Sequence, residues 1–147
     1  MANPFVQQGT LNRLLGNVVF AQWPQLTVTA PFLGKGAISF AFEGDASQLI
    51  GTMTGAVTSP EPYVFGTVTI HLVRSQTLAN VFKNQLLLNT VLGSVTVYPD
   101  TTAMAPIDIE SCVLQSIQEV TFDGTQAEFV VKIRGVYSIN AYMFLTA

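Results

Sequence analysis

The feature that most restricts how this chain can fold is an alternation of apolar and polar residues with a period of two. Apolar side chains occupy every second position from Ile38 to Phe42, and again from Val68 to Leu72. Because neighbouring side chains of a β-strand point to opposite faces, this pattern predicts half-buried strands over 38–43 and 64–73. The same reasoning predicts further strands over residues 92–98, 107–113, 119–122, 128–134 and 136–145.

One segment between these predicted strands has a different period. It follows Ser75, a candidate N-cap, and its apolar residues recur at steps of three and four, at Leu78, Val81, Phe82 and Leu86. This spacing predicts one amphipathic helix that ends near Leu88. We therefore predict a mainly β fold, an antiparallel β-sandwich or barrel with one flanking α-helix.

Residues suited to turns separate the predicted strands. A polar connection contains Pro99, Asp100 and Pro106, which a central strand would not tolerate. Asp123 and Gly124 suit the positive φ angles of a tight hairpin turn.

Two segments, residues 1–17 and 47–62, fit a compact core poorly. They carry apolar residues outside any regular pattern, namely Phe5, Leu11, Leu14, Leu15 and Val57. We expect residues 1–17 to form an extended N-terminal arm and residues 47–62 a protruding loop or long hairpin, each reaching towards neighbouring subunits. The 147 residues are expected to form a single domain, which at this size buries about 68–70% of its unfolded surface.

The charge content is unusually low. Six Lys and Arg residues stand against nine Asp and Glu residues, for a net charge of -3, and only 10% of the residues are charged. An ordinary soluble domain has about 25%. A surface of Thr, Ser, Asn and Gln is easier to desolvate than one of Lys and Glu, so this composition favours burial against partner subunits. The acidic balance argues against specific nucleic-acid binding.

The sequence contains no signal for a membrane or for secretion. No apolar run approaches the roughly 20 residues that a membrane-spanning helix requires. Residues 1–8 lack the basic and apolar regions of a secretion signal. The single cysteine, Cys112, cannot form an internal disulfide, in agreement with a reducing compartment. We expect synthesis and retention in a cytoplasm.

The residues that most often carry chemistry are too few and too dispersed to form a readable site. His71 and Cys112 are the single residues of their kinds and lie about 40 positions apart, so a structural zinc site is not expected. We interpret His71 as a hydrogen-bonded or surface histidine and Cys112 as a small buried apolar residue. A Cys-His nucleophilic pair remains the functional alternative, but no flanking motif supports one.

Two carboxylates, Asp108 and Glu110, lie two positions apart on a predicted strand, so they share one face about 6.6 Å apart. That spacing suits paired-carboxylate catalysis, but solvated acids on a strand face are far more common. The Gly-Lys-Gly segment 34–36 lacks the pattern of a phosphate-binding loop, and we expect a tight turn with an exposed lysine. Trp23 is expected to anchor a core or an interface. We predict no enzyme activity, no catalytic residue, no cofactor and no metal.

Two stretches carry a resemblance to a known family. From Gly66 the chain reads GTVTIHLVRSQTLANVFKNQLLLNTVLGSVTVYPD, and from Cys112 it reads CVLQSIQEVTFDGTQAEFVVKIRG. This order of strand, basic residue, capped helix, Gly-Ser-Val-Thr-Val strand and closing hairpin resembles the tail tube proteins of contractile-tailed bacteriophages. The resemblance spans about half of the chain.

The resemblance implies packed β-sheets flanked by a helix, with six copies per ring and rings stacked into a hollow tube that conducts DNA into the host. It also implies a virion tail protein, assembled in the host cytoplasm, that contacts sheath, baseplate and tail-terminator proteins, with Lys83 a candidate for the sheath contact. The candidate interface residues are Phe5, Leu11, Arg13, Leu14, Leu15, Trp23 and Val57. The candidates for the channel lining are Glu43, Asp45, Asp108 and Glu110.

Two other classes of protein are compatible with the pattern. A small β-barrel that binds an apolar ligand in its interior would also combine low charge with aromatic strands. A secreted β-sandwich hydrolase is the third reading, but no nucleophile, base and orienting group can be identified together.

Overall fold

The computed structural model describes residues 4–9, 16–73, 77–99, 105–117, 125 and 128–140. The strands in these ranges are β1 (Gly16–Phe20), β2 (Leu33–Glu43), β3 (Ser47–Gly51), β4 (Ala56–Pro60), β5 (Tyr63–Val73), β6 (Val91–Pro99), β7 (Ile107–Ile117) and β8 (Glu128–Ser138). The α-helix, α1, is Thr77–Leu88, and two short 3-10 helices are η1 (Pro24–Leu26) and η2 (Ala30–Phe32).

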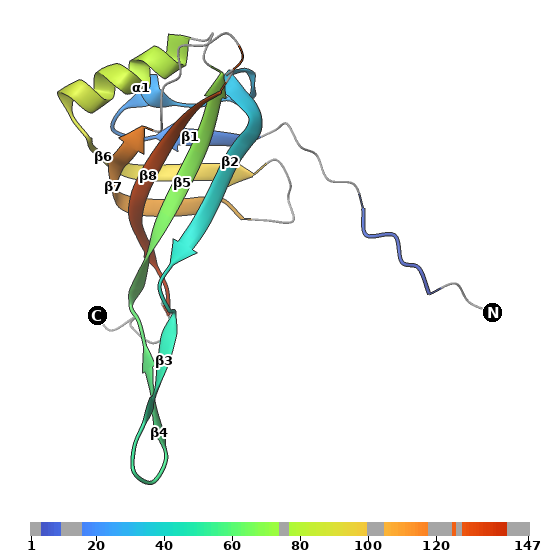
Figure 1. Ribbon diagram of the computed structural model, residues 1–147, viewed down its shortest axis with the longest axis vertical. Coiled ribbons are helices and arrows are strands. Elements are labelled where there is room, and N and C mark those ends of the chain that lie inside the picture. Colours follow the sequence, from blue (N-terminus) through green and yellow to red (C-terminus); the bar gives the residue numbers. More distant parts are fainter. Residues whose placement is uncertain are drawn as a thin grey trace.

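Six of the strands form one antiparallel sheet with the order β1-β6-β7-β8-β5-β2, and β3 pairs with β4 in a separate hairpin. The large sheet is curled, so that β1, β6 and β7 cross the direction of β8, β5 and β2 (Figure 1). Register shifts interrupt the β6–β7 and β7–β8 pairs, where Gly93 and Ser111 have positive φ angles. Such bulges bend a strand and help a sheet to curl. The predicted mainly β fold with one flanking helix is confirmed.

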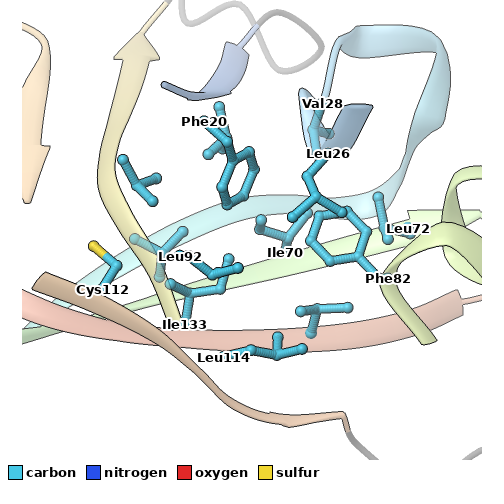
Figure 2. Packing of buried hydrophobic residues seen from close by; sticks show 14 of the residues in the cluster. Phe20, Leu26, Val28, Ile70, Leu72, Phe82, Leu92, Cys112, Leu114 and Ile133 are labelled. Carbon is cyan, nitrogen blue, oxygen red and sulfur yellow. The ribbon is translucent and has the colours of Figure 1, made fainter. Parts of the chain in front are cut away.

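The hydrophobic core fills the inside of the curl, and we call the sheet face that carries it the inner face. The rings of Phe20 and Phe82 meet edge to face, with centroids 5.8 Å apart, among side chains from β5, β8 and η1 (Figure 2). In β5 the predicted alternation is confirmed, because Val68, Ile70 and Leu72 are fully buried. The α-helix covers one end of the curl through Leu78, Ala79 and Phe82.

The helix is where it was predicted, but its buried stripe differs. Gln85 is buried and its side-chain amide donates a hydrogen bond to the Asn89 carbonyl at 2.8 Å, whereas Leu86 is 39% exposed. Leu86 belongs to the apolar stripe read from the sequence, but the buried side of α1 continues from Phe82 to Gln85, three residues later, so the stripe was wrong at this position. Ser75, the proposed N-cap, lies outside the described residues.

Segment 34–36 forms no tight turn, and that prediction was wrong, because these residues lie within an irregular stretch of β2. The glycines permit close approach instead. A Cβ atom on Gly36 would lie 2.7 Å from the His71 ring, and one on Gly34 would lie 3.0 Å from Glu128.

The predicted boundary between strands 128–134 and 136–145 was also wrong, since β8 continues through Gly135 to Ser138. Gly135 is required because a Cβ atom there would lie 2.6 Å from the Cys112 sulfur. The predicted strand 119–122, the Asp123-Gly124 turn and residues 141–145 lie outside the described residues.

Candidate assembly surfaces

The β3–β4 hairpin extends well beyond the large sheet (Figure 1). Every residue from Ser47 to Thr58 is exposed, including Leu49 at 72% and Met53 at 101%. The sequence has no charged residue from position 46 to position 60. An isolated two-stranded hairpin is marginally stable in water. A hairpin that is both apolar and free of charge is therefore suited to burial against another molecule.

The two faces of this hairpin carry different apolar side chains. The register pairs Ile50 with Val57 on one face and Leu49 with Thr58 on the other. The face of Leu49 borders a shallow groove of about 380 Å³, which we call the hairpin groove. The residues that line it are Ser47, Gln48, Leu49, Thr58, Pro60 and Asn140.

The base of the hairpin is held by Asn140, just beyond the end of β8. Its side-chain amide donates hydrogen bonds to the carbonyl oxygens of Glu61, at 2.7 Å, and Ala46, at 3.2 Å. The Glu61 amide also donates to the Ala46 carbonyl at 2.9 Å. Asn140 has a φ of 52°, a conformation that asparagine tolerates better than most residues. These contacts fix the direction in which the hairpin leaves the sheet.

An ion pair lies on the outer face of the sheet near the same base. Glu43 is 2.8 Å from Arg134, and its other carboxylate oxygen accepts a hydrogen bond from the Thr67 hydroxyl at 2.6 Å. The Arg134 guanidinium also stacks 4.4 Å above the Phe65 ring. The Thr67 hydrogen bond has the largest effect and lowers the pKa of Glu43; desolvation opposes it, and the charge and hydrogen bond of Arg134 lower the pKa further. Glu43 is a candidate for the channel lining, but its negative charge is neutralised by Arg134.

The other candidate acids are exposed. Asp45 lies between β2 and the hairpin. Asp108 and Glu110 flank the buried Ile109 on β7, so they share the outer face, and the Thr96 hydroxyl donates to Asp108 at 2.7 Å. Their place on a channel wall stays a prediction.

An aromatic cluster at the lower end of the sheet was not predicted. Phe40 and Phe42 have ring centroids 4.7 Å apart, and Phe42 lies 5.2 Å from Tyr137. These residues are on the inner face, but the sheet extends past the core, so Phe42 is 57% exposed. The predicted alternation was correct for this strand, but period alone does not show where the covering layer ends.

The two edges of the large sheet are not equivalent. On β1, Val18 exchanges two backbone hydrogen bonds with Val28, of 3.0 and 2.9 Å, so the following segment covers that edge. β2 lies at the other edge, and within the described ranges no strand pairs with its outer side. An unpaired strand edge is a template for pairing with another chain.

The remaining candidate interface residues are dispersed. Phe5 is 75% exposed and Val57 54% exposed. Trp23 packs partly against the core, and its indole N–H donates to the Val91 carbonyl at 3.1 Å. Leu11, Arg13, Leu14 and Leu15 lie outside the described residues.

His71 is hydrogen-bonded and Cys112 is buried, as predicted. His71 lies 3.1 Å from a Glu128 oxygen, and Cys112 is fully buried, which raises the pKa of its thiol to about 12. In the part of the chain that the structure describes, no three His, Cys, Asp or Glu residues are grouped to hold a metal ion. In the same ranges, no helix has the length and apolar character needed to cross a bilayer.

Among known proteins, this chain is similar in fold to a solved structure. No protein-family model and no curated protein matches the sequence. Among solved structures, the chain is similar to the tube-terminating cap of the anti-feeding prophage, determined by cryo-electron microscopy. The TM-score is 0.53 at 12% sequence identity, and the match covers 92% of this chain and 96% of the cap chain. The likeness therefore extends over nearly the full length of both chains.

Proposed function

We propose that this chain is a structural subunit of a phage-type tail, which self-assembles into stacked hexameric rings that form the hollow tail tube. The observation that carries the proposal is the charge-free hairpin, which projects from the sheet and exposes apolar side chains on both faces. The likeness of fold to a protein that terminates a tube supports it. In this proposal the subunit acts in the virion tail, assembles in the host cytoplasm and performs no catalysis.

The unequal sheet edges suit a ring. A closed ring with more than two subunits needs contacts between two different surfaces of each subunit. β2 presents an unpaired edge, whereas the edge of β1 is covered by the segment around Val28. The β2 edge of one subunit would thus pair with a different surface of its neighbour. The low charge content reduces the cost of desolvating these surfaces.

The distribution of acids suits a channel through which DNA passes without binding. Each contact between a basic residue and phosphate adds affinity and would slow passage. The charge of Glu43 is neutralised by Arg134. Asp108 and Glu110 are exposed acids for which no salt bridge to a basic residue is found among the described residues, and Asp108 accepts a hydrogen bond only from the neutral Thr96 hydroxyl. We place these two on the channel wall. Sheath, baseplate and tail-terminator proteins are the expected partners, with Lys83 of α1 on the side that faces the sheath.

A second function within the same tail is favoured by one observation. The similar structure is a cap that terminates a tube, and not a tube subunit. This chain would then form a single ring at one end of the tail. The two functions differ in one respect, which is whether rings stack on themselves.

The interior ligand-binding barrel has less support. The space inside the curl is occupied by Phe20, Phe82, Leu26 and Ile70, each at most 1% exposed. A ligand pocket for an apolar molecule would need that volume to be open.

The experiment that tests the proposal is negative-stain electron microscopy of the purified chain at high concentration, with its mass from light scattering. Hollow tubes support the tube function, and rings that never stack support the terminal ring. A 15.9 kDa monomer under all conditions would overturn both.

A further inference from the structure

The inner face of the large sheet carries aromatic side chains beyond the point where its covering layer ends. We call Phe40, Phe42 and Tyr137 the aromatic cluster. Their rings meet edge to face, with centroid separations of 4.7, 5.2 and 6.2 Å. Phe40 and Tyr137 pack partly against the core, but Phe42 is 57% exposed. A contiguous exposed apolar surface of this kind marks an interaction site.

A glycine beneath the cluster accounts for one of its rings. A Cβ atom on Gly66 would lie 2.5 Å from the Phe40 ring, so this ring fills the space that a side chain at position 66 would take. Covering a strand glycine with an aromatic ring is a role within the sheet itself. Phe42 has no such role, because more than half of its side chain stays open to solvent.

The two faces of the sheet differ in charge around the cluster. On β8, Glu128, Lys132 and Arg134 lie on the outer face and alternate with the residues of the inner face. The inner-face residues of β2, β5 and β8 next to the cluster are uncharged, namely Ile38, Val64, Gly66, Ile133 and Gly135. The β3–β4 hairpin has no charged residue either. Contact between these two surfaces would therefore bury no ion.

We propose that the β3–β4 hairpin of one copy packs against the aromatic cluster of a second copy, with the hairpin face of Ile50 and Val57 on the exposed ring of Phe42. Ile50 and Val57 are opposite each other across the hairpin and are 49% and 54% exposed. Each partner is a sheet with an apolar face, and such a face is stable when another element covers it. Two sheets pack in this way about 10 Å apart.

The occupant is a second copy because the hairpin points away from the cluster of its own subunit. Asn140 ties the hairpin base to the end of β8, and the Ile139 amide donates to the Pro62 carbonyl at 3.1 Å. The hairpin thus extends from the lower end of the sheet, and not back over its inner face (Figure 1). Because the contact joins two different surfaces, it can repeat from copy to copy. The inference rests on the proposed function, which supplies the neighbouring copies.

The test is fluorescence quenching between two full-length chains. One carries Phe42→Trp, which keeps a ring in the cluster, and the other carries Gln48→Cys labelled with a nitroxide, a quencher that acts at short range. Gln48 lies on the hairpin face of Ile50, and the native Cys112 is fully buried and stays unlabelled. The signal of Trp23 is subtracted with the parent chain, mixed with the same labelled chain. A matched control moves the label to Gln115→Cys, an exposed position on β7.

We expect the emission of the introduced tryptophan to fall by about half or more in assembled samples, and to stay unchanged with the control label, because a docked hairpin raises the local concentration of the quencher. Microscopy of the same samples reports tubes independently. Tubes without quenching above the control would overturn the inference and leave the proposed function intact. Quenching in samples without tubes would support the contact and reject the tube.

Other occupants of the cluster give different results. A chain that carries both changes, diluted into unmodified chain and still fully quenched, would show that its own hairpin reaches the cluster, and would refute the assignment to a second copy. Shielding of the introduced tryptophan from acrylamide in the dilute monomer would show that another part of the same chain covers the cluster, and would also overturn the inference. So would absence of quenching at the highest concentration of unassembled protein.

A second measurement does not depend on a label. Phe42→Ala and Val57→Ser each remove one side of the contact and should each raise the critical concentration for assembly about tenfold. The double variant should assemble no worse than either single variant, because the second change removes a contact already lost. The matched control combines Phe42→Ala with Leu49→Ser on the other hairpin face, where losses should add. Additive losses in both pairs would contradict the contact.

Phe42 is partly buried, so the fold of its variants is checked in the same series. The free energy of unfolding of each unassembled variant is measured by chemical denaturation. If Phe42→Ala does not fold, Phe42→Ser and Phe42→Leu bracket the loss of apolar surface in its place. A critical concentration that is the same for folded Phe42→Leu and Phe42→Ser as for the parent would overturn the inference.

Discussion

The hairpin provides the most direct test of assembly, because its exposed side chains add nothing to the core of a single subunit. Leu49, Ile50 and Val57 are 72%, 49% and 54% exposed. Full burial of such a side chain contributes about 1.5–3 kcal/mol. Scaled by the exposed fractions, replacing all three with serine removes at most about 3–5 kcal/mol per hairpin from assembly.

A tenfold change in an equilibrium constant corresponds to about 1.4 kcal/mol. We therefore expect the triple variant, Leu49→Ser with Ile50→Ser and Val57→Ser, to raise the critical concentration for assembly by about two to four orders of magnitude. The assay is sedimentation over a range of protein concentrations, with microscopy of the pellets. The free energy of unfolding of the unassembled variant, measured by thermal unfolding, should stay within about 0.5 kcal/mol of that of the parent, as for most surface substitutions.

The matched control is Leu87→Ser with Leu88→Ser, since these residues of α1 are 76% and 82% exposed and remove a similar apolar area elsewhere. An unchanged critical concentration in the hairpin variant would refute the reasoning. An equal rise in the control would show that general surface hydrophobicity, and not the hairpin, drives assembly.

Three further predictions follow from single contacts. Gly135→Ala should lower the free energy of unfolding by about 1–3 kcal/mol in chemical denaturation, because the new Cβ meets the Cys112 sulfur. Adding Cys112→Ala should restore part of this loss, and no restoration would contradict the packing reason. Glu43 has a lowered pKa, so its contribution to stability is present above the ordinary value of 4.5 and is lost as pH falls through the lower folded value. Glu43→Gln should remove this part of the acid dependence of thermal unfolding, and an unchanged pH profile would show that the ion pair contributes nothing. Replacing Asp108 and Glu110 with Lys should reduce DNA ejection while tubes still form, with the two Asn and Gln substitutions as controls for charge; full infectivity of the lysine variant would remove these residues from the channel wall.

Much of the fold could be predicted because burial alternates locally along each strand. The period of two identified β5, β6 and β8, and the change of period identified α1 and its end at Leu88. The Asp108 and Glu110 pair was placed on one face for the same reason. These features depend on a few neighbouring residues, which the sequence shows directly.

The errors occurred where a distant segment decides the environment. The glycines at 34 and 36 were interpreted as a turn, but they make room for side chains of Glu128 and His71 on other strands. Gly135 was interpreted as a strand boundary, and it makes room for Cys112. A sequence records that a residue is small, but not which side chain requires the space.

The sequence by itself determined that this chain is mainly β, has one helix and is poor in charge, because period and composition are local properties. Tertiary structure alone decided the features on which the proposed assembly rests. The pairing of Glu43 with Arg134 and the clasp of Asn140 on Ala46 and Glu61 join residues far apart in the chain. The sheet extends past its core and exposes Phe42, and the hairpin projects with only β3 and β4 paired among the residues that the structure describes. Where the sheet curls and where its covering layer ends are results of packing the whole chain, so no local pattern could have shown them.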